Sequence, residues 1–151
     1  HDALPISIFI TPTQRRNFDE DGHIRETHGD YPDAMRWVAQ REGVPVIELH
    51  DMTRAFFEHL GIEGSTKALV HYPAHTFKGQ TQTLADNTHF NPYGAYEVAK
   101  MVCQGLLELK MPVSNFLNDD FKGFDPTRPD NPDTFIWDAS PFIDITKPDG
   151  N

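Results

Sequence analysis

The sequence predicts an α/β architecture with parallel strands. Two short apolar runs, residues 6–11 and 44–49, each suit a strand that is buried on both faces of a sheet. Each run is followed, directly or after a loop, by a segment with helical periodicity, so the order is strand, helix, strand, helix. Such alternation needs crossover connections, which place successive strands parallel in one sheet. The length of 151 residues, of which 38% are hydrophobic, allows one domain with a sizeable core.

The first predicted strand, Ile6 to Thr11, is apolar and β-branched, and it ends at Pro12. Residues 13–29 are polar and charged without a sustained period, which indicates a loop above the sheet. We expect the first helix to begin at Asp30-Tyr31-Pro32, because proline is favoured in the first helical turn, and to end at Gly43.

The second predicted strand covers residues 44–49 and has Pro45 near its start, the strand position where a missing N–H group is best tolerated. A second helix is expected over residues 50–60, closed by Gly61. Residues 63–83 contain scattered glycine and proline, and they indicate a second loop.

The longest predicted helix begins at Asn91-Pro92 and runs to about Lys110. Its apolar stripe is expected to face the sheet and consists of Ala95, Val98, Ala99, Val102, Leu106 and Leu109. The tail from residue 112 to 148 is rich in aspartate and proline, so we expect it to lie on the surface without regular structure. Its expected anchors are the aromatic residues Phe116, Phe121, Phe124, Phe135, Trp137 and Phe142.

The composition excludes several classes of function. A formal net charge of -10 without a Lys/Arg cluster repels phosphate backbones, so nucleic acid is not an expected partner. No hydrophobic run approaches the roughly 20 residues that cross a bilayer, so no membrane partner is expected either. Cys103 is the single cysteine, and it is expected to be a buried, inert thiol within the last helix.

The sharpest local feature of the sequence is an acid three residues before a histidine, Asp86 and His89, just ahead of the last helix. A turn of this length can bring the Asp86 carboxylate to one ring nitrogen of His89, which leaves the other nitrogen free as a general base. The same spacing also occurs where a histidine merely packs and an aspartate starts a turn, so the spacing alone leaves both interpretations open.

Other side chains are candidates for substrate binding. Arg15 and Arg16 follow the first strand, where ligand sites form in α/β folds, and they suit contact with a ligand carboxylate, although ordinary solvated arginines fit equally well. His71, His75 and Asn87 suit hydrogen bonds to a ligand, as do His28 and Tyr72, although all of these also fit ordinary surface loops. Pro73 breaks the helix that would align His71 with His75, so a metal pair is not expected there. Trp37 is expected to pack on its helix.

The stretch from Ala85 to Glu97, Ala-Asp-Asn-Thr-His-Phe-Asn-Pro-Tyr-Gly-Ala-Tyr-Glu, resembles the last conserved block of the SGNH/GDSL hydrolases. It is most similar to the bacterial rhamnogalacturonan acetylesterase branch, as are residues 10–16, 28–32, 70–74 and 145–151. This resemblance implies a flavodoxin-like α/β/α sandwich and a serine hydrolase that uses no metal or other cofactor. It also implies Asp86 and His89 as the catalytic acid and base.

The family's serine lies in a Gly-Asp-Ser block, and its oxyanion hole uses a Gly-x-Asn-Asp segment. Neither segment occurs here, and the serines present are Ser7, Ser65, Ser114 and Ser140. We therefore expect residues 7–110 to be the C-terminal half of the hydrolase domain, lacking the N-terminal half, and residues 111–151 to be a tail that packs on it. Residues 1–6 are expected to be non-native, because a common DNA-sequencing adapter encodes this hexapeptide.

The resemblance implies a carbohydrate O-acetylesterase that removes acetyl groups from rhamnogalacturonan or a similar plant polysaccharide or oligosaccharide. Its parent enzyme is expected to be secreted or periplasmic, and this chain is expected to be inactive alone because the nucleophile is missing. The alternative is a non-catalytic carbohydrate-binding or interaction module derived from the same fold.

Overall fold

Helices and short strands alternate along the chain in a computed structural model that describes residues 7–138. Four expectations lie outside the described residues: those on residues 1–6, on Ser140, on Phe142 and on residues 145–151. The elements are β1 (Phe9–Ile10), α1 (Tyr31–Glu42), β2 (Val46–Ile47), α2 (Leu49–Gly64), the 3-10 helix η1 (Ser65–Ala68), β3 (Leu69–Tyr72), β4 (Leu84–Phe90), α3 (Pro92–Glu108) and the 3-10 helix η2 (Pro112–Phe116).

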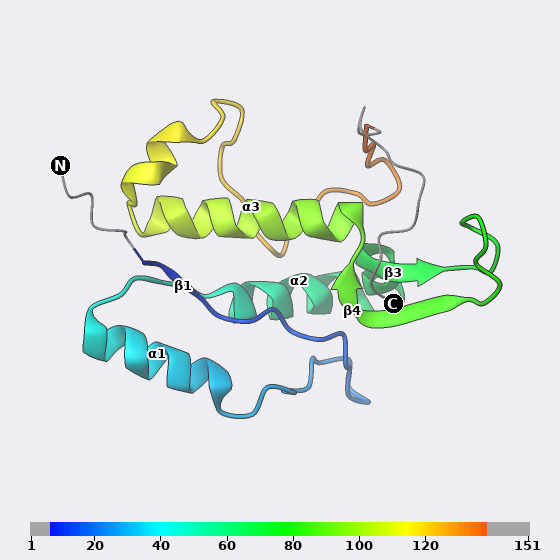
Figure 1. Cartoon of the computed structure of the whole chain (residues 1–151), viewed down its shortest axis with the longest axis horizontal. Coiled ribbons are helices and arrows are strands. Elements are labelled where there is room, and N and C mark those ends of the chain that lie inside the picture. The colour runs from blue at the N-terminus through cyan, green and yellow to red at the C-terminus, as the bar shows by residue number, and fades with distance from the viewer. Residues whose placement is uncertain (1–6, 139–151) are drawn as a thin grey trace.

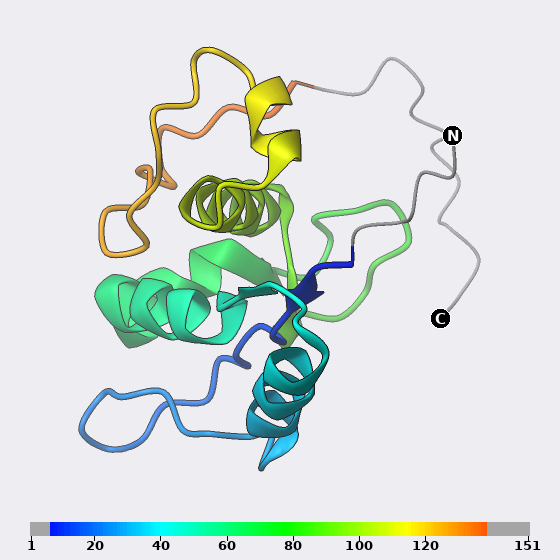
Figure 2. The same cartoon turned by 90° about the vertical axis from the view of Figure 1, so that its left-hand side faces the viewer.

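Strands β1 and β2 pair in parallel, with Phe9 opposite Val46 and Ile10 opposite Ile47. Helix α1 lies on one side of this pair and α3 on the other, as Figures 1 and 2 show. Helix α3 approaches β2 closely at Gly105, where a Cβ atom would lie 2.5 Å from Cγ2 of Ile47. The predicted α/β class is confirmed, and the layering is that of part of a flavodoxin-like α/β/α sandwich.

The two glycines predicted to end helices have left-handed backbones. Gly43 follows α1 with φ 66°, and its N–H donates to the carbonyl of Ala39, which satisfies a carbonyl at the helix end. Gly61 has φ 69° and interrupts α2, after which the chain resumes a helical turn to Gly64. A side chain is strained in this region of the backbone map, so glycine is the residue that fits both positions.

Strands β3 and β4 form an antiparallel hairpin, which the sequence did not predict. Leu69 pairs with Phe90 and Tyr72 with Leu84, with an irregularity in register between them. The expectation of a continuous loop over residues 63–83 is therefore wrong for residues 63–72, which end α2 and form η1 and β3. The hairpin escaped prediction because β3 has four residues and β4 carries mostly exposed polar side chains, so neither shows a clear alternation.

The predicted stripe of α3 is right only in part, since Val98 and Val102 pack against the core as partly buried side chains. The residues that α3 buries are Tyr93, Gly94, Glu97, Met101 and Gly105, whereas Ala95 and Ala99 are exposed. Buried residues recur about every four positions along α3, but they include two glycines and a glutamate, which a search for apolar residues does not find. The buried face packs on a core that contains Phe56, Phe57 and Leu69, all fully buried.

Some predicted anchors and packed side chains are exposed instead. In the tail, Phe124 and Phe135 pack against the core, but Phe116 is 88% exposed and Trp137 is 61% exposed. Trp37 is also largely exposed, with the guanidinium of Arg41 lying 4.7 Å from its ring centre. Cys103 is only partly buried. No helix within residues 7–138 combines the length and the apolar character that a bilayer crossing requires.

Candidate active site

The structure brings Asp86 and His89 together at the end of β4. Oδ2 of Asp86 accepts a hydrogen bond from Nδ1 of His89 at 2.7 Å. The other carboxylate oxygen, Oδ1, accepts from the backbone N–H groups of Thr88 at 2.7 Å and of His89 at 3.0 Å. Three hydrogen bonds therefore orient one carboxylate, and the ring nitrogen Nε2 of His89 carries no bond to another described residue.

The electrostatics of this pair suit a proton acceptor. The backbone N–H of His89, the His89 ring and the N–H of Thr88 together lower the pKa of Asp86 to about 2, so the carboxylate is ionised at neutral pH. An ionised carboxylate stabilises the positive charge that His89 gains when it takes a proton. The His89 side chain is 76% exposed, so a substrate or a second protein segment can reach it.

A tightly packed junction positions the end of β4. The side chain of Asn91 caps α3 by accepting from the N–H of Gly94, and its amide group donates to the carbonyls of Lys67 and Leu69. A Cβ atom on Gly94 would lie 2.0 Å from the carbonyl oxygen of Ala68. Because only glycine allows this approach, Gly94 lets α3 begin directly beside the end of η1. This contact fixes the position of the end of β4, which carries His89.

Three of the candidate binding residues form a network beside the pair. Oδ1 of Asn87 accepts from NH1 of Arg16 and lies 3.0 Å from Nε2 of His71. The guanidinium of Arg16 also donates to the hydroxyl of Ser65 and to the carbonyl of Ile62. Burial lowers the pKa of Arg16, and its donors are largely used inside the protein. Arg16 therefore ties β4 to the segment after β1, and His71 and Asn87 remain closer to the surface.

The other two candidates stand apart from this network. Arg15 is exposed and has no hydrogen bond to the pair or to Asn87 among the described residues. His75 lies in the loop between β3 and β4 with a left-handed backbone, φ 68°, and its N–H donates to the carbonyl of Gln80. The structure thus brings together Arg16, His71, Asn87, Asp86 and His89, but neither Arg15 nor His75.

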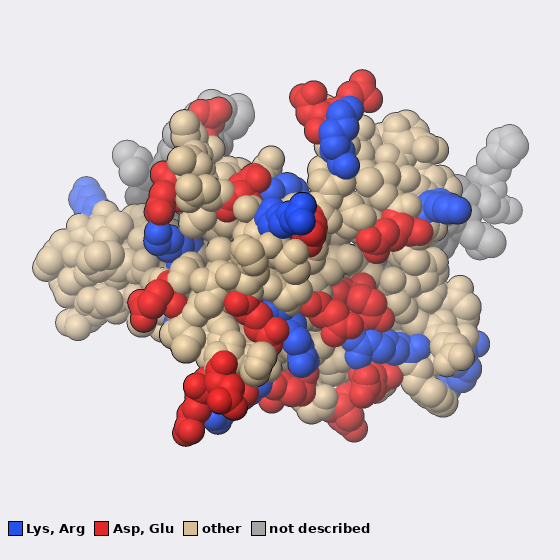
Figure 3. Space-filling view, turned by 180° about the vertical axis from the view of Figure 1, so that it is seen from behind, with Lys and Arg blue, Asp and Glu red and all other residues tan. Residues whose placement is uncertain are grey.

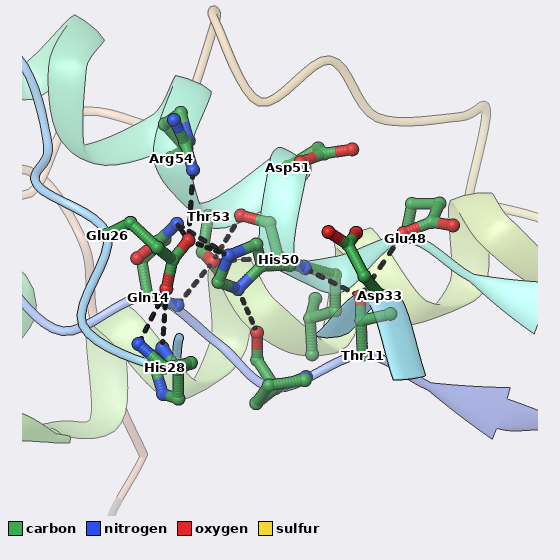
Figure 4. Close-up of polar contacts among 12 residues, drawn as sticks. Thr11, Gln14, Glu26, His28, Asp33, Glu48, His50, Asp51, Thr53 and Arg54 are labelled. Carbon is green, nitrogen blue, oxygen red and sulfur yellow. Dashed lines mark hydrogen bonds and ion pairs between the residues drawn. The ribbon is translucent and has the colours of Figure 1, made fainter. Parts of the chain in front are cut away.

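A second carboxylate–histidine group surrounds the buried ring of His50, and the sequence did not reveal it. Nε2 of His50, at the start of α2, is 2.6 Å from Oε2 of Glu26, and Nδ1 of His28 is 3.5 Å from Oε1 of the same carboxylate. Figure 4 shows His50 at the centre of these contacts. The ligand atoms of Glu26, His28 and His50 lie within 4.8 Å of one another, a spacing that can hold a metal ion. Glu26 and His50 are 24 residues apart, so no local motif marks them.

Comparison with known proteins identifies relatives over most of the chain. The chain is 42% identical over 110 residues to rhamnogalacturonan acetylesterase RhgT of Bacillus subtilis (strain 168), which is 73% of this chain and 47% of the relative. The chain is a homologue of rhamnogalacturonan acetylesterases. It is also 33% identical over 107 residues to the probable rhamnogalacturonan acetylesterase YesY of the same bacterium, covering 71% of this chain and 45% of that relative.

The chain spans about half the length of these curated acetylesterases. No family model matches it. A search of solved structures found no match either. This similarity confirms the resemblance to rhamnogalacturonan acetylesterases that the sequence indicated.

Proposed function

We propose that this chain supplies the acid–base half of the active site of a serine esterase that removes acetyl groups from rhamnogalacturonan. The observation that carries the proposal is the oriented pair of Asp86 and His89, with 2.7 Å between carboxylate and ring. The homology to rhamnogalacturonan acetylesterases supports the substrate class, an acetylated polysaccharide or oligosaccharide.

The proposed chemistry is acyl transfer. Because Nδ1 of His89 donates to Asp86, Nε2 carries the lone pair that takes the proton of a serine hydroxyl. The serine oxygen then attacks the acetyl carbonyl, the sugar hydroxyl leaves with the proton from His89, and water releases acetate from the acyl-enzyme. The chain requires no metal for these steps.

The nucleophile is proposed to come from outside the described residues. Within residues 7–138, no serine hydroxyl is hydrogen bonded to His89, and that of Ser65 is buried and bonded to Arg16 and to the carbonyl of Ile62. Loss of a triad nucleophile lowers turnover by about a million-fold. We therefore expect the 151-residue chain alone to release no measurable acetate.

Sugar contacts are proposed for the exposed side of the network beside the pair. His71 is half-buried, Asn87 is exposed, and both lie next to the catalytic carboxylate in the hairpin. Imidazole and amide groups can hydrogen bond to sugar hydroxyls on the same surface that presents His89. Acidic side chains are spread over the face seen in Figure 3 with Lys and Arg between them, so this face carries mixed charge.

The test is a chimaera in which this chain replaces the matching segment of RhgT. We expect the chimaera to release acetate from acetylated rhamnogalacturonan, and His89→Ala to lower that rate by at least about a thousand-fold. His59→Ala is the matched control, because His59 is an exposed histidine on α2. Retention of activity by the His89 variant would refute the role of the pair.

The substrate claim needs a separate comparison. Acetate release by the active chimaera is measured on acetylated rhamnogalacturonan and on acetylated xylan. Equal rates on both polymers would remove the claim of a pectic substrate and leave a general carbohydrate esterase. A chimaera that folds and binds the polymer, but gives no His89-dependent activity, would favour a non-catalytic carbohydrate-binding module.

A further inference from the structure

The group of Glu26, His28 and His50 lies where ligand sites form in α/β folds. Gln14 follows β1 closely, and His50 opens α2 directly after β2, so both lie at the carboxyl ends of the parallel strands. Glu26 and His28 come from the long connection between β1 and α1. This group is separate from the Asp86–His89 pair, which belongs to β4.

The hydrogen bonds of His50 determine its tautomer. Nδ1 lies 2.9 Å from the carbonyl of Pro12, which can only accept, so Nδ1 carries a proton. In a neutral ring, Nε2 then presents a lone pair to Oε2 of Glu26 at 2.6 Å. Two lone pairs at this distance repel each other, so a proton or a metal ion must lie between them.

Two further buried atoms in this group lack partners. Nδ1 of His28 makes no hydrogen bond among the described residues, and neither does Oε1 of Gln14, whose residue is 1% exposed. The Gln14 amide lies 2.8 Å from Nε2 of His50, and a half-turn of this amide would bring its oxygen to the same place. Buried polar atoms without partners are rare, and binding an ion is one of the ways in which proteins satisfy such atoms.

We propose that Glu26, His28 and His50 bind one divalent cation of the zinc class. Two imidazoles and a carboxylate are a donor set that zinc prefers, and the fourth position stays open for water or for the Gln14 oxygen. A ring nitrogen held by a backbone carbonyl, as Nδ1 of His50 is held by Pro12, is the usual support of a ligating histidine.

The geometry requires one small adjustment. Ligands about 2.0 to 2.1 Å from a tetrahedral ion are about 3.3 Å apart, so Glu26 must retreat by about 0.7 Å from His50. The Glu26 side chain is 37% exposed, which gives it room to move and gives the ion a path from solvent. Bound there, the ion joins the connection after β1 to the first turn of α2.

A cation already competes for the carboxylate. NH2 of Arg54 lies 3.3 Å from Oε2 of Glu26, and the charge of Arg15 adds to burial, the main cause, in lowering the pKa of His28. These charges oppose a second cation, so removing Arg54 should strengthen metal binding. A purely structural role for Glu26 would not produce this effect.

The experiment titrates the purified, untagged 151-residue chain with ZnCl2 by calorimetry after treatment with a chelator. Co2+ serves as a second probe, because a tetrahedral site gives it intense visible absorption. We expect one ion per chain, binding at least tenfold weaker in Glu26→Gln and His28→Gln, and tighter in Arg54→Gln. Circular dichroism checks that each variant is folded.

Exposed histidines provide the control, because they also bind zinc weakly. His59→Gln is expected to bind zinc as tightly as the unaltered chain, whereas His28→Gln is expected to bind it more weakly. The proposal would be overturned if the chain bound no zinc, or if the folded Glu26 and His28 variants bound zinc as tightly as the unaltered chain. In that case a proton on Nε2 of His50 would account for its short contact with Glu26. The outcome is independent of esterase activity, because it is measured without a substrate.

Discussion

Two carboxylate–histidine pairs in this chain have nearly the same contact distance and equally exposed carboxylates, but their histidines differ in exposure. Asp86 meets His89 at 2.7 Å and Glu26 meets His50 at 2.6 Å. The side chain of His89 is 76% exposed, whereas that of His50 is 3% exposed. The distance between two such groups therefore says little about their role, which depends on what the second ring nitrogen can reach.

The second ring nitrogen separates the two pairs. In His89 it is Nε2, which has no described partner and is free to exchange a proton with a substrate group. In His50 both ring nitrogens are engaged, one by the Pro12 carbonyl and one by Glu26 and Gln14. The exposed pair thus suits proton transfer, and the buried pair suits holding a loop, a helix start or an ion in place.

The largest expected effect is on catalysis by the exposed pair. In the chimaera with RhgT, Asp86→Asn should lower acetate release by roughly ten-thousand-fold, because the amide no longer holds the working tautomer or stabilises the charged ring. Thermal unfolding should change little, since the pair lies at the surface. Glu26→Gln is the comparison, and a similar loss of turnover in that variant would erase the distinction between the pairs.

The junction beneath the exposed pair should be sensitive to a single methyl group. Gly94→Ala places a Cβ atom 2.0 Å from the Ala68 carbonyl and should lower the free energy of unfolding by about 3 kcal/mol. Urea denaturation followed by circular dichroism measures this change. Gly64→Ala is the matched control, because its Cβ atom would meet only Cβ of Leu60 at 3.6 Å and should have almost no effect.

The two histidines should differ in their contribution to stability. His50→Gln breaks buried bonds to Pro12 and Glu26 and should lower the free energy of unfolding by roughly 2 kcal/mol. His89→Gln loses only an exposed pair and should change that free energy by less than about 0.5 kcal/mol. Equal values from the two variants in urea denaturation would contradict the assignment of a structural role to the buried ring.

The smallest expected effect is the pH dependence that Asp86 contributes. Its hydrogen bonds lower its folded-state pKa to about 2 from the ordinary aspartate value of 3.8, so the folded state favours the ionised form. The resulting stability is present above pH 4 and is lost as the pH falls towards 2. The pair is exposed, so the contribution is at most about 1 kcal/mol. The difference in free energy of unfolding between the unaltered chain and Asp86→Asn should shrink as the pH falls from 5 to 2. A constant difference over this range would contradict the stabilising role of the Asp86 carboxylate.

Local chemistry made part of this molecule predictable from its sequence. Gly43 marked the end of α1 and Gly61 the interruption of α2, because few other residues adopt their backbone angles, and the apolar runs 6–11 and 44–49 marked the parallel strands β1 and β2. Asp86 and His89 are only three positions apart, so the sequence could indicate their contact as one of two interpretations. Each of these features depends on residues that are close together along the chain.

Tertiary structure alone decided the remaining features. The hairpin of β3 and β4 depends on pairing across a connection of eleven residues, which no period in the sequence reveals. The face that α3 buries is set by close approach at Gly94 and Gly105 to other elements. Glu26, His28 and His50 meet only because parallel strands end at one edge of a sheet. Contacts between distant residues are determined by packing of the whole fold. For that reason the sequence did not indicate the group around His50, whereas it did indicate the pair of Asp86 and His89.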